Sequence, residues 1–427
     1  MPHDASSSPT GKNALKLLLF TVLLGAFAGL VIWCFLKAVA FGTELVWQVV
    51  PKRTGSRALT VFLPAAGGLL VGILHKYYGN YPDELTVVME KVKKEKHYDY
   101  HPMFIILVCA FLPLVFGSSV GPEAGLTGII AALCYWVGDN VSFAKQNTAV
   151  LSQAGEALTL GQLFHSPLFG ILAVEEESQE AQSAALPLSK SWKLVLYGLS
   201  TAASFLVIGI CNHLFGKAMS GFPSFSEVPI SRLDYVLLLV YIPVGIVLYL
   251  LFEKCEQLTG MAAARLPVIL RETLCGAVIG LMGLVLPIVL FSGEEQMHGL
   301  MEDPGAYTPW FLLIVCLVKI IMTAFCLNFG MKGGHFFPLI FACTCMGYAL
   351  TMLFFADSIS HAAFAAGIVT AAVLGAQLKK PLAASVLLLL CFPVRFLFWL
   401  FLSAALGSFL SQQLEKRRHD KNQPAEK

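Results

Sequence analysis

The sequence predicts an all-α membrane protein, built as an internally repeated bundle of tilted and broken transmembrane helices. Of its 427 residues, 57% are hydrophobic and only 13% are charged, whereas roughly a quarter of residues are charged in soluble proteins. Long apolar runs recur along the chain, and glycine or proline interrupts many of them. Helix-start motifs that contain proline also occur at matching spacings in the two halves. Together these observations favour broken membrane helices over a soluble fold.

The N-terminal residues 1–12 are polar and lack the basic region and short apolar core of a signal peptide. We therefore expect a cytoplasmic N-terminal segment. The apolar run that follows, residues 14–40, exceeds the roughly 20 residues that a helix needs to cross a bilayer. It predicts a first helix that is retained in the membrane.

Further apolar runs follow it, and several are too short to cross a bilayer upright, which indicates tilted or broken helices. No run alternates with period two over ~10 residues, which argues against an outer-membrane barrel. The polar stretch 293–298 is interpreted as a loop without a role. The predicted runs are 14–40, 58–74, 102–116, 126–137, 149–174, 194–215, 235–252, 274–291, 310–329, 336–355, 362–378 and 381–410.

These runs define one membrane domain, residues 13–411, with approximate halves 13–218 and 230–411, followed by a basic cytoplasmic tail, 412–427. The positive-inside tendency places the lysine cluster within residues 91–96 in the cytoplasm. Two crossings from a cytoplasmic N-terminus are consistent with that placement. The basic loop 52–57 then faces outward, against the same tendency.

The sequence indicates no metal site, no cofactor and no nucleic-acid partner. The 11 cysteines are scattered singly through the chain and lack metal-ligand spacing, so they are interpreted as small buried residues. The formal net charge is only +2, which gives no reason to expect nucleic-acid binding.

The helix-start motifs repeat at nearly equal spacing. Pro167 follows Pro122 by 45 residues, and Pro381 follows Pro338 by 43 residues. Interrupted segments at corresponding positions of two halves point to a transport site at the interface between the repeats. The alternative is that these are ordinary kinked helices, since glycine and proline are frequent in membrane helices.

The stretch 116–125, Phe-Gly-Ser-Ser-Val-Gly-Pro-Glu-Ala-Gly, predicts a helix that begins inside the membrane. Proline at the first helical position keeps its missing N–H harmless. The free N–H groups of a first helical turn favour an anion. The motif therefore predicts an anion-friendly helix start, and the alternative for its glycines is close helix packing.

The ordered set of motifs resembles the CLC family of chloride channels and proton–chloride antiporters. Residues 333–338, Gly-Gly-His-Phe-Phe-Pro, resemble its G-G-I-F-A-P motif. Residues 164–177 resemble its F-N-A-P-L-A-G-I-L-F-x-x-E-E stretch, and residues 375–383 resemble a late helix start of that family. The resemblance implies a CLC-like inverted-repeat bundle, and a homodimer with one pathway in each subunit. It also implies a compact bacterial form in the inner membrane, without a regulatory nucleotide-binding pair, and both termini are expected in the cytoplasm.

The sequence departs from the family pattern at three places. Val120 stands where the family has its gating glutamate, and a carboxylate occurs instead at Glu123, after the motif proline. Gly79 stands where the family has a chloride-coordinating serine. The final helix has no match for the family's pore-lining tyrosine. These differences resemble a divergent prokaryotic branch with a G-P-E motif.

The resemblance implies that the amides of His335 and Phe336 face a central anion, while amides near Val120, Gly121 and Glu123 serve the outer part. For Glu123, a proton gate and a helix-capping carboxylate stay open as alternatives. For Glu176 and Glu177, the alternatives are proton transfer and a solvated helix end. The predicted anion pathway consists of Gly79, Val120, Gly121, Pro122, Glu123, Gly334, His335, Phe336 and Phe337, and the possible proton path of Glu123, Glu176 and Glu177.

The sequence thus predicts a membrane protein that moves chloride or a similar small anion. Val120 at the gate position favours a passive channel. The alternative is a proton-coupled chloride antiporter that uses Glu123 and Glu177. Two further classes stay open, a non-anion secondary transporter and a membrane-embedded enzyme, for which Glu156 and His165 are the nearest candidate pair.

Overall fold

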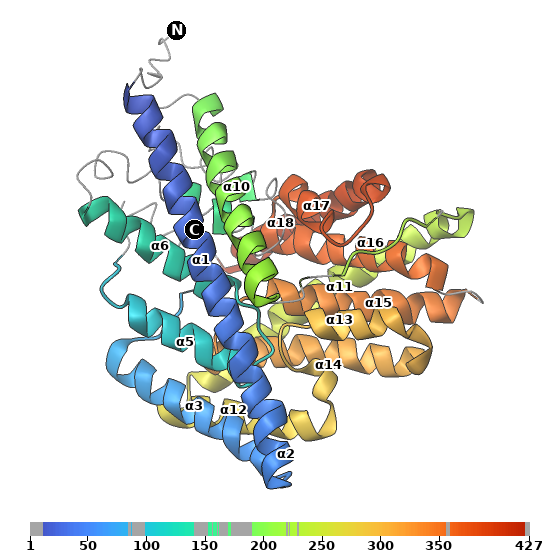
Figure 1. Ribbon diagram of the computed structural model, residues 1–427. Coiled ribbons are helices and arrows are strands. Elements are labelled where there is room, and N and C mark those ends of the chain that lie inside the picture. The colour runs from blue at the N-terminus through green and yellow to red at the C-terminus, as the bar shows by residue number, and fades with distance from the viewer. Residues whose placement is uncertain are drawn as a thin grey trace, which may run out of the picture.

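The computed structural model shows an α-helical bundle (Figure 1). It describes residues 12–83, 87, 99–140, 153–155, 157–159, 161, 170–171, 190–218, 221, 223–228, 230–355 and 359–422. Within these residues the only strand-like pairing is an isolated bridge between Gly121 and Gly334. The prediction of an all-α protein is confirmed.

Within the described ranges, nine helices are long and apolar enough to cross a membrane. They are α1 (Lys12–Glu44), α3 (Leu59–Tyr78), α10 (Lys190–Phe215), α11 (Arg232–Ala263), α12 (Val268–Val285), α14 (Pro309–Asn328), α15 (Phe336–Phe354), α16 (Ile359–Leu378) and α18 (Leu397–Asn422). Shorter helices are α2 (Val50–Thr54), α5 (Met103–Val115), α6 (Glu123–Asn140), α13 (Glu294–Glu302) and α17 (Pro381–Leu388), with a π-helical segment, Leu45–Val49, and 3₁₀ segments at Pro287–Val289, Pro304–Ala306 and Val394–Phe396. The protein is therefore a multi-pass membrane protein.

Three expectations for element boundaries were wrong. The run 274–291 is not one helix, because α12 ends at Val285 and Pro287 begins a 3₁₀ turn. The run 381–410 divides into α17 and α18 around Pro393, which lies outside both helices. The stretch 293–298 is not a loop, since α13 begins at Glu294. Apolar composition alone does not locate such breaks, because it continues through them.

The most deeply buried helices are α15 and α16, which pack against each other and against α14, α11 and α18. Small residues in α16 let neighbouring backbones approach closely; a Cβ on Gly375, for example, would overlap Ala404 of α18. In the first half of the chain, α1 and α10 run side by side (Figure 1), with Gly25 and Gly29 set against Ser200 and Ser204. The bundle therefore buries α15 at its centre.

Glycines bring α3 and α12 into backbone contact. A Cβ on Gly68 or Gly72 of α3 would meet the backbone of α12, and one on Gly276 or Gly280 of α12 would meet the backbone of α3. Such small residues allow close helix approach in a membrane, where packing replaces the hydrophobic effect between helices. This pair consequently has little room for any side chain at its interface.

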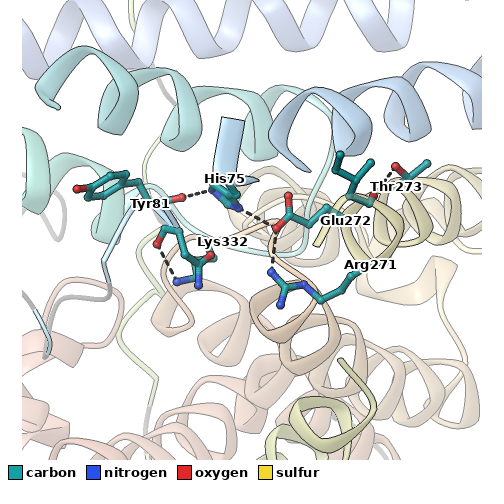
Figure 2. A network of polar contacts seen from close by, with 8 residues as sticks. His75, Tyr81, Arg271, Glu272, Thr273 and Lys332 are labelled. Atoms are coloured by element: carbon teal, nitrogen blue, oxygen red, sulfur yellow. Dashed lines mark hydrogen bonds and ion pairs between the residues drawn. The ribbon is translucent and has the colours of Figure 1, made fainter. Parts of the chain in front are cut away.

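A buried polar network joins the same two helices to the loop that follows α3 (Figure 2). Glu272 Oε1 lies 2.8 Å from His75 Nδ1 and 2.9 Å from an Arg271 guanidinium nitrogen. The other ring nitrogen of His75 lies 2.5 Å from the carbonyl oxygen of Tyr81. Lys332 Nζ donates to the carbonyl of Asn80 at 3.2 Å. The network therefore links loop 79–82 to α12 and to the segment that precedes α15.

We expect Gly276→Val to destabilise the protein, because its side chain would overlap the carbonyl of Pro64. Forcing extra carbon atoms into a packed interface costs about 1–3 kcal/mol. The apparent melting temperature of the purified protein in detergent should therefore fall. Gly198→Ala is the matched control, since Gly198 has no atom within 4 Å of its Cβ position. An equal fall for both variants would contradict the close-packing account.

We expect Glu272→Ala to cost about 3 kcal/mol, as is typical when one partner of a buried ion pair is removed. The fully buried carboxylate is the common partner of His75 and Arg271. Thermal unfolding in detergent measures the loss. Thr273→Ala is the control, because the Thr273 hydroxyl bonds only the carbonyl of Ile269 in its own helix. A Glu272 variant as stable as this control would show that the network does not hold the loop.

Candidate anion site at the N-termini of two broken helices

The turns that precede α6 and α15 have the same backbone conformation. Phe116, the residue after α5, has φ −87° and ψ 12°, and Phe329, the residue after α14, has φ −85° and ψ 11°. The next residue is a glycine with positive φ in both cases, 82° at Gly117 and 92° at Gly330. Glycine enters this region at little steric cost. The first helix-start motif of each half is therefore preceded by the same turn, whereas Pro167 of the predicted repeat lies outside the described residues.

Four residues beyond each of these glycines, the two turns pair with each other. The N–H of Gly121 donates to the carbonyl of Gly334, and the N–H of Gly334 donates to the carbonyl of Gly121, both at 2.8 Å. The Ser118 hydroxyl adds a bond to the carbonyl of Met331 at 2.9 Å. Buried backbone groups in a membrane need partners inside the protein. This pairing supplies them and brings the N-termini of α6 and α15 together.

The side chain of Glu123, the first residue of α6, reaches the N-terminus of α15. Its Oε1 accepts the N–H groups of Phe336 at 3.1 Å and Phe337 at 3.4 Å. The residue is 1% exposed. Free N–H groups at a helix N-terminus favour a negative group. The start of α15 thus has the chemistry of an anion site, and the protein's own carboxylate occupies it.

The second oxygen of this carboxylate, Oε2, is buried and has no hydrogen-bond partner among the described residues. A Cβ on Gly121 or on Gly334 would overlap the carboxyl group. The two glycines therefore serve two purposes, since they form the backbone pair and leave space for the Glu123 side chain. An unpaired buried oxygen costs free energy, so the carboxylate is not held as firmly as a fully satisfied one.

The other predicted residues of the first motif lie around this carboxylate. The N–H groups of Val120 and Gly121 donate to Ser118 and Gly334 and so are already used within the protein. The amides that point at a negative group are those of Phe336 and Phe337. Val120 and Pro122 line a cavity of about 420 Å³ next to the motif.

His335, the residue before α15, contacts a partner that the sequence did not suggest. Its Nε2 accepts the side-chain amide of Gln377 in α16 at 3.2 Å. Its ring also lies against Phe252 and Phe336, with centroid distances of 5.7 and 4.5 Å. The ring is therefore held by packing and one hydrogen bond beside the α15 N-terminus.

Gly79 ends α3 with φ 111°. It begins loop 79–82, which the polar network of Figure 2 ties to the segment before α15 through Lys332 and Asn80. This hydrogen bond links the loop that begins at Gly79 to Lys332, which precedes the second helix-start motif. The proton-path residues Glu176 and Glu177, and the alternative pair Glu156 and His165, lie outside the described residues.

Sequence reasoning missed two buried charged side chains near the site. Lys319 in α14 is fully buried, and its Nζ donates to the carbonyls of Val289, Leu290 and Phe291 at 3.0, 3.2 and 2.6 Å. Glu294 at the start of α13 is 3% exposed. Lys319 is a single charge within an apolar run, and Glu294 is the first of two glutamates that follow one; charges at membrane depth by default mark function.

Known proteins resemble this chain over most of its length. A sequence profile described as "Voltage gated chloride channel" matches residues 67–412. "Chloride channel protein CLC-e" of Arabidopsis thaliana is 27% identical over 346 residues, which are 75% of this chain and 47% of the relative. The chain thus spans about half of that relative's length. "H(+)/Cl(-) exchange transporter ClcA" of Vibrio cholerae is 24% identical over 371 residues, 83% of this chain and 76% of the relative.

Solved structures have the same fold at low identity. A cyanobacterial Cl⁻/H⁺ antiporter described as slow aligns with a TM-score of 0.75 and 18% identity, over 97% of this chain and 100% of that chain. A CLC-type fluoride/proton antiporter aligns with a TM-score of 0.72 and 18% identity, over 95% and 98%. Since the family profile covers most of the sequence and the fold agrees, the protein belongs to the voltage-gated chloride channel (CLC) family.

Proposed function

We propose that this protein moves chloride or a similar small anion across the membrane, past the N-terminus of α15, and that Glu123 competes with the anion for that site. The observation that carries the proposal is the pair of N–H groups, from Phe336 and Phe337, that Glu123 Oε1 accepts. A carboxylate oxygen is a negative acceptor, as a halide ion is. An anion can therefore take these amides only after the carboxylate leaves.

Protonation is the simplest way to release the carboxylate. A neutral carboxyl group is a weaker acceptor for the two N–H groups, because charge-assisted hydrogen bonds are roughly twice as strong as neutral ones. The unpaired Oε2 offers a position for the proton. Anion passage then requires an acid form of Glu123, which makes transport sensitive to pH and links it to proton movement.

The two forms of the function differ in how often Glu123 must release its proton. In a proton-coupled antiporter it does so in each cycle, and in a passive channel it stays neutral or displaced while many anions pass. Val120 favours the channel, because it replaces a carboxylate with an apolar side chain next to the pathway. The occupied α15 site favours the antiporter. The relatives include a protein named as a proton–chloride exchanger and a structure described as a fluoride/proton antiporter.

The family consists of channels and transporters, which disfavours the membrane-embedded enzyme considered from the sequence. Converging helix N-termini disfavour a cation transporter, since carbonyl ends and carboxylates coordinate cations. By resemblance we further propose a homodimer in a bacterial inner membrane, with cytoplasmic termini and one pathway in each subunit. Glu176 and Glu177 are proposed to serve the cytoplasmic end of a proton path.

We expect anion efflux from proteoliposomes to rise as the pH falls, because protonated Glu123 no longer competes for the α15 amides. Glu123→Gln, which cannot ionise, should carry anions at neutral pH at least about tenfold faster than the parent protein and should lose the pH dependence. Efflux of chloride, fluoride and nitrate, recorded together with proton uptake, measures this.

Glu227→Gln is the control, since this carboxylate is exposed and lies outside the helices. A Glu123→Gln protein that retains the parent's pH dependence would show that Glu123 is not the gate. If the parent protein releases no anion at any pH, the proposed function itself is wrong. Proton uptake that accompanies anion efflux in a fixed ratio, and is lost in Glu123→Gln, would favour the antiporter over the channel.

A further inference from the structure

The cavity beside the first motif, which Val120 and Pro122 line, also has a polar wall. That wall is formed by the start of α13 and the residues before it, Ser292, Glu294, Glu295 and Gln296. The C-terminal part of α1 and the residues after α10 complete the enclosure. At about 420 Å³, the cavity can hold several water molecules, since one water occupies ≈ 30 Å³ of liquid volume. The cavity therefore has room for water beside the proposed anion site.

Glu294 lines this cavity although its surface is only 3% exposed. It is placed there by Gly293, which has φ 106° and lies directly against α15, where a Cβ would come within 2.6 Å of Phe341 Cβ. Ser292 supplies a hydrogen bond to its carboxyl group. Helix α13 consequently starts with a buried carboxyl group between the cavity and the centre of the bundle.

Lys319 fixes the segment that carries Glu294. Its ammonium group holds the carbonyls of residues 289–291, and the N–H of Phe291 donates to the carbonyl of Gly117 at 3.3 Å. One end of the segment is thus bound to α14 and to the turn before the first motif. This attachment keeps Glu294 at a constant position relative to Val120, Pro122 and Glu123.

Glu294 and Glu123 are close enough to interact electrostatically. Burial raises the pKa of Glu294 to about 8, and the charges of Glu123 and Glu295 act in the same direction. Other titratable groups around Glu294 are Glu44 of α1 and Lys217 after α10, which line the same cavity. Burial, and then the charge of Glu294, raises the pKa of the Cys391 thiol. A carboxyl group with a pKa near neutral can both take up and release protons at physiological pH.

We propose that Glu294 is a proton-transfer residue that carries protons between the cavity and Glu123. This inference rests on the proposed function, in which Glu123 must gain and lose a proton. In one direction, a hydronium ion in the cavity gives its proton to a carboxylate oxygen of Glu294. Glu294 then gives a proton to the unpaired Oε2 of Glu123 and returns to its carboxylate form. The reverse sequence discharges Glu123 into the cavity, and no electrons are transferred.

The geometry also explains why such a residue is needed. Val120 and Pro122, which lie between the cavity and the α6 N-terminus, have no group that could pass a proton. Glu123 itself does not line the cavity. A second carboxyl group that does line it, and that senses the charge of Glu123, supplies the missing step.

The test compares Glu294→Gln with Glu295→Gln in proteoliposomes, with anion efflux and proton uptake recorded together. Glu295 lines the same cavity but is exposed, so it is the matched control. We expect Glu294→Gln to slow proton uptake at least about tenfold, because general acid–base groups typically contribute 10²–10⁴-fold, and we expect Glu295→Gln to leave it unchanged. Continued anion efflux in Glu294→Gln would show that the variant is folded and that the pathway is open.

The outcomes separate the two proposals. If the parent protein moves anions and protons and Glu294→Gln does so equally well, Glu294 is not the proton-transfer residue, while the proposed function stands. If the parent moves anions without protons, the proton-transfer role is overturned and a channel remains. If the parent moves no anion, both proposals are wrong. Equal losses in Glu294→Gln and Glu295→Gln would also overturn the assignment, because they would indicate a general effect of charge in the cavity.

Discussion

The two hydrogen bonds between Gly121 and Gly334 are the interaction on which the rest of the site depends. Helices that begin inside a membrane expose N–H groups that no water can satisfy. The backbone pair satisfies part of this demand and sets the two helix starts against each other. A Cβ at either position would overlap the Glu123 side chain in its present position, so the two glycines let this carboxyl group lie against α15. The N–H groups of Phe336 and Phe337 then donate to a negative group, the Glu123 carboxylate.

Buried charges hold the chain around this centre in an arrangement that apolar packing could not specify. Lys319 binds three successive carbonyls before α13, and Glu272 binds His75 and Arg271 beside the loop that contains Gly79. A Cβ on Gly330 would overlap Glu272, so this carboxylate also abuts the turn that leads to α15. Each charge is costly to bury alone. Each of these two side chains instead stabilises a non-helical segment, which has no regular hydrogen-bonding pattern of its own.

The anion site and the adjacent cavity share the same protein elements. The motif 117–123 lines the cavity through Val120 and Pro122, and its Glu123 side chain accepts an N–H group at the start of α15. The start of α13 supplies a polar part of the wall, and the segment before it is bound to the motif by the hydrogen bond from Phe291 N–H to the Gly117 carbonyl. The proposed movement of Glu123 away from α15 would therefore take place beside a cavity with an acidic wall. This arrangement fits the proposed role of Glu123, whose carboxyl group alternates between a charged form bound to α15 and a protonated form that leaves it.

The all-α membrane class, the main helices and the two helix-start motifs could all be predicted from the sequence, because they depend on local composition and on glycine and proline at particular positions. The break at Val285, the helix that begins at Glu294 and the division of the last apolar run could not, since apolar composition continues across them or short polar runs resemble loops.

For the site, the sequence by itself determined that anion-friendly helix starts occur as a repeated pair and that a carboxylate lies beside one of them. Only the tertiary structure decided that the Glu123 side chain reaches the other helix, that Gly121 and Gly334 pair, and that Glu294 lines a cavity next to them. The physical reason is that these contacts join residues about 170 to 210 positions apart, and such distances in sequence leave no periodicity or local propensity to detect.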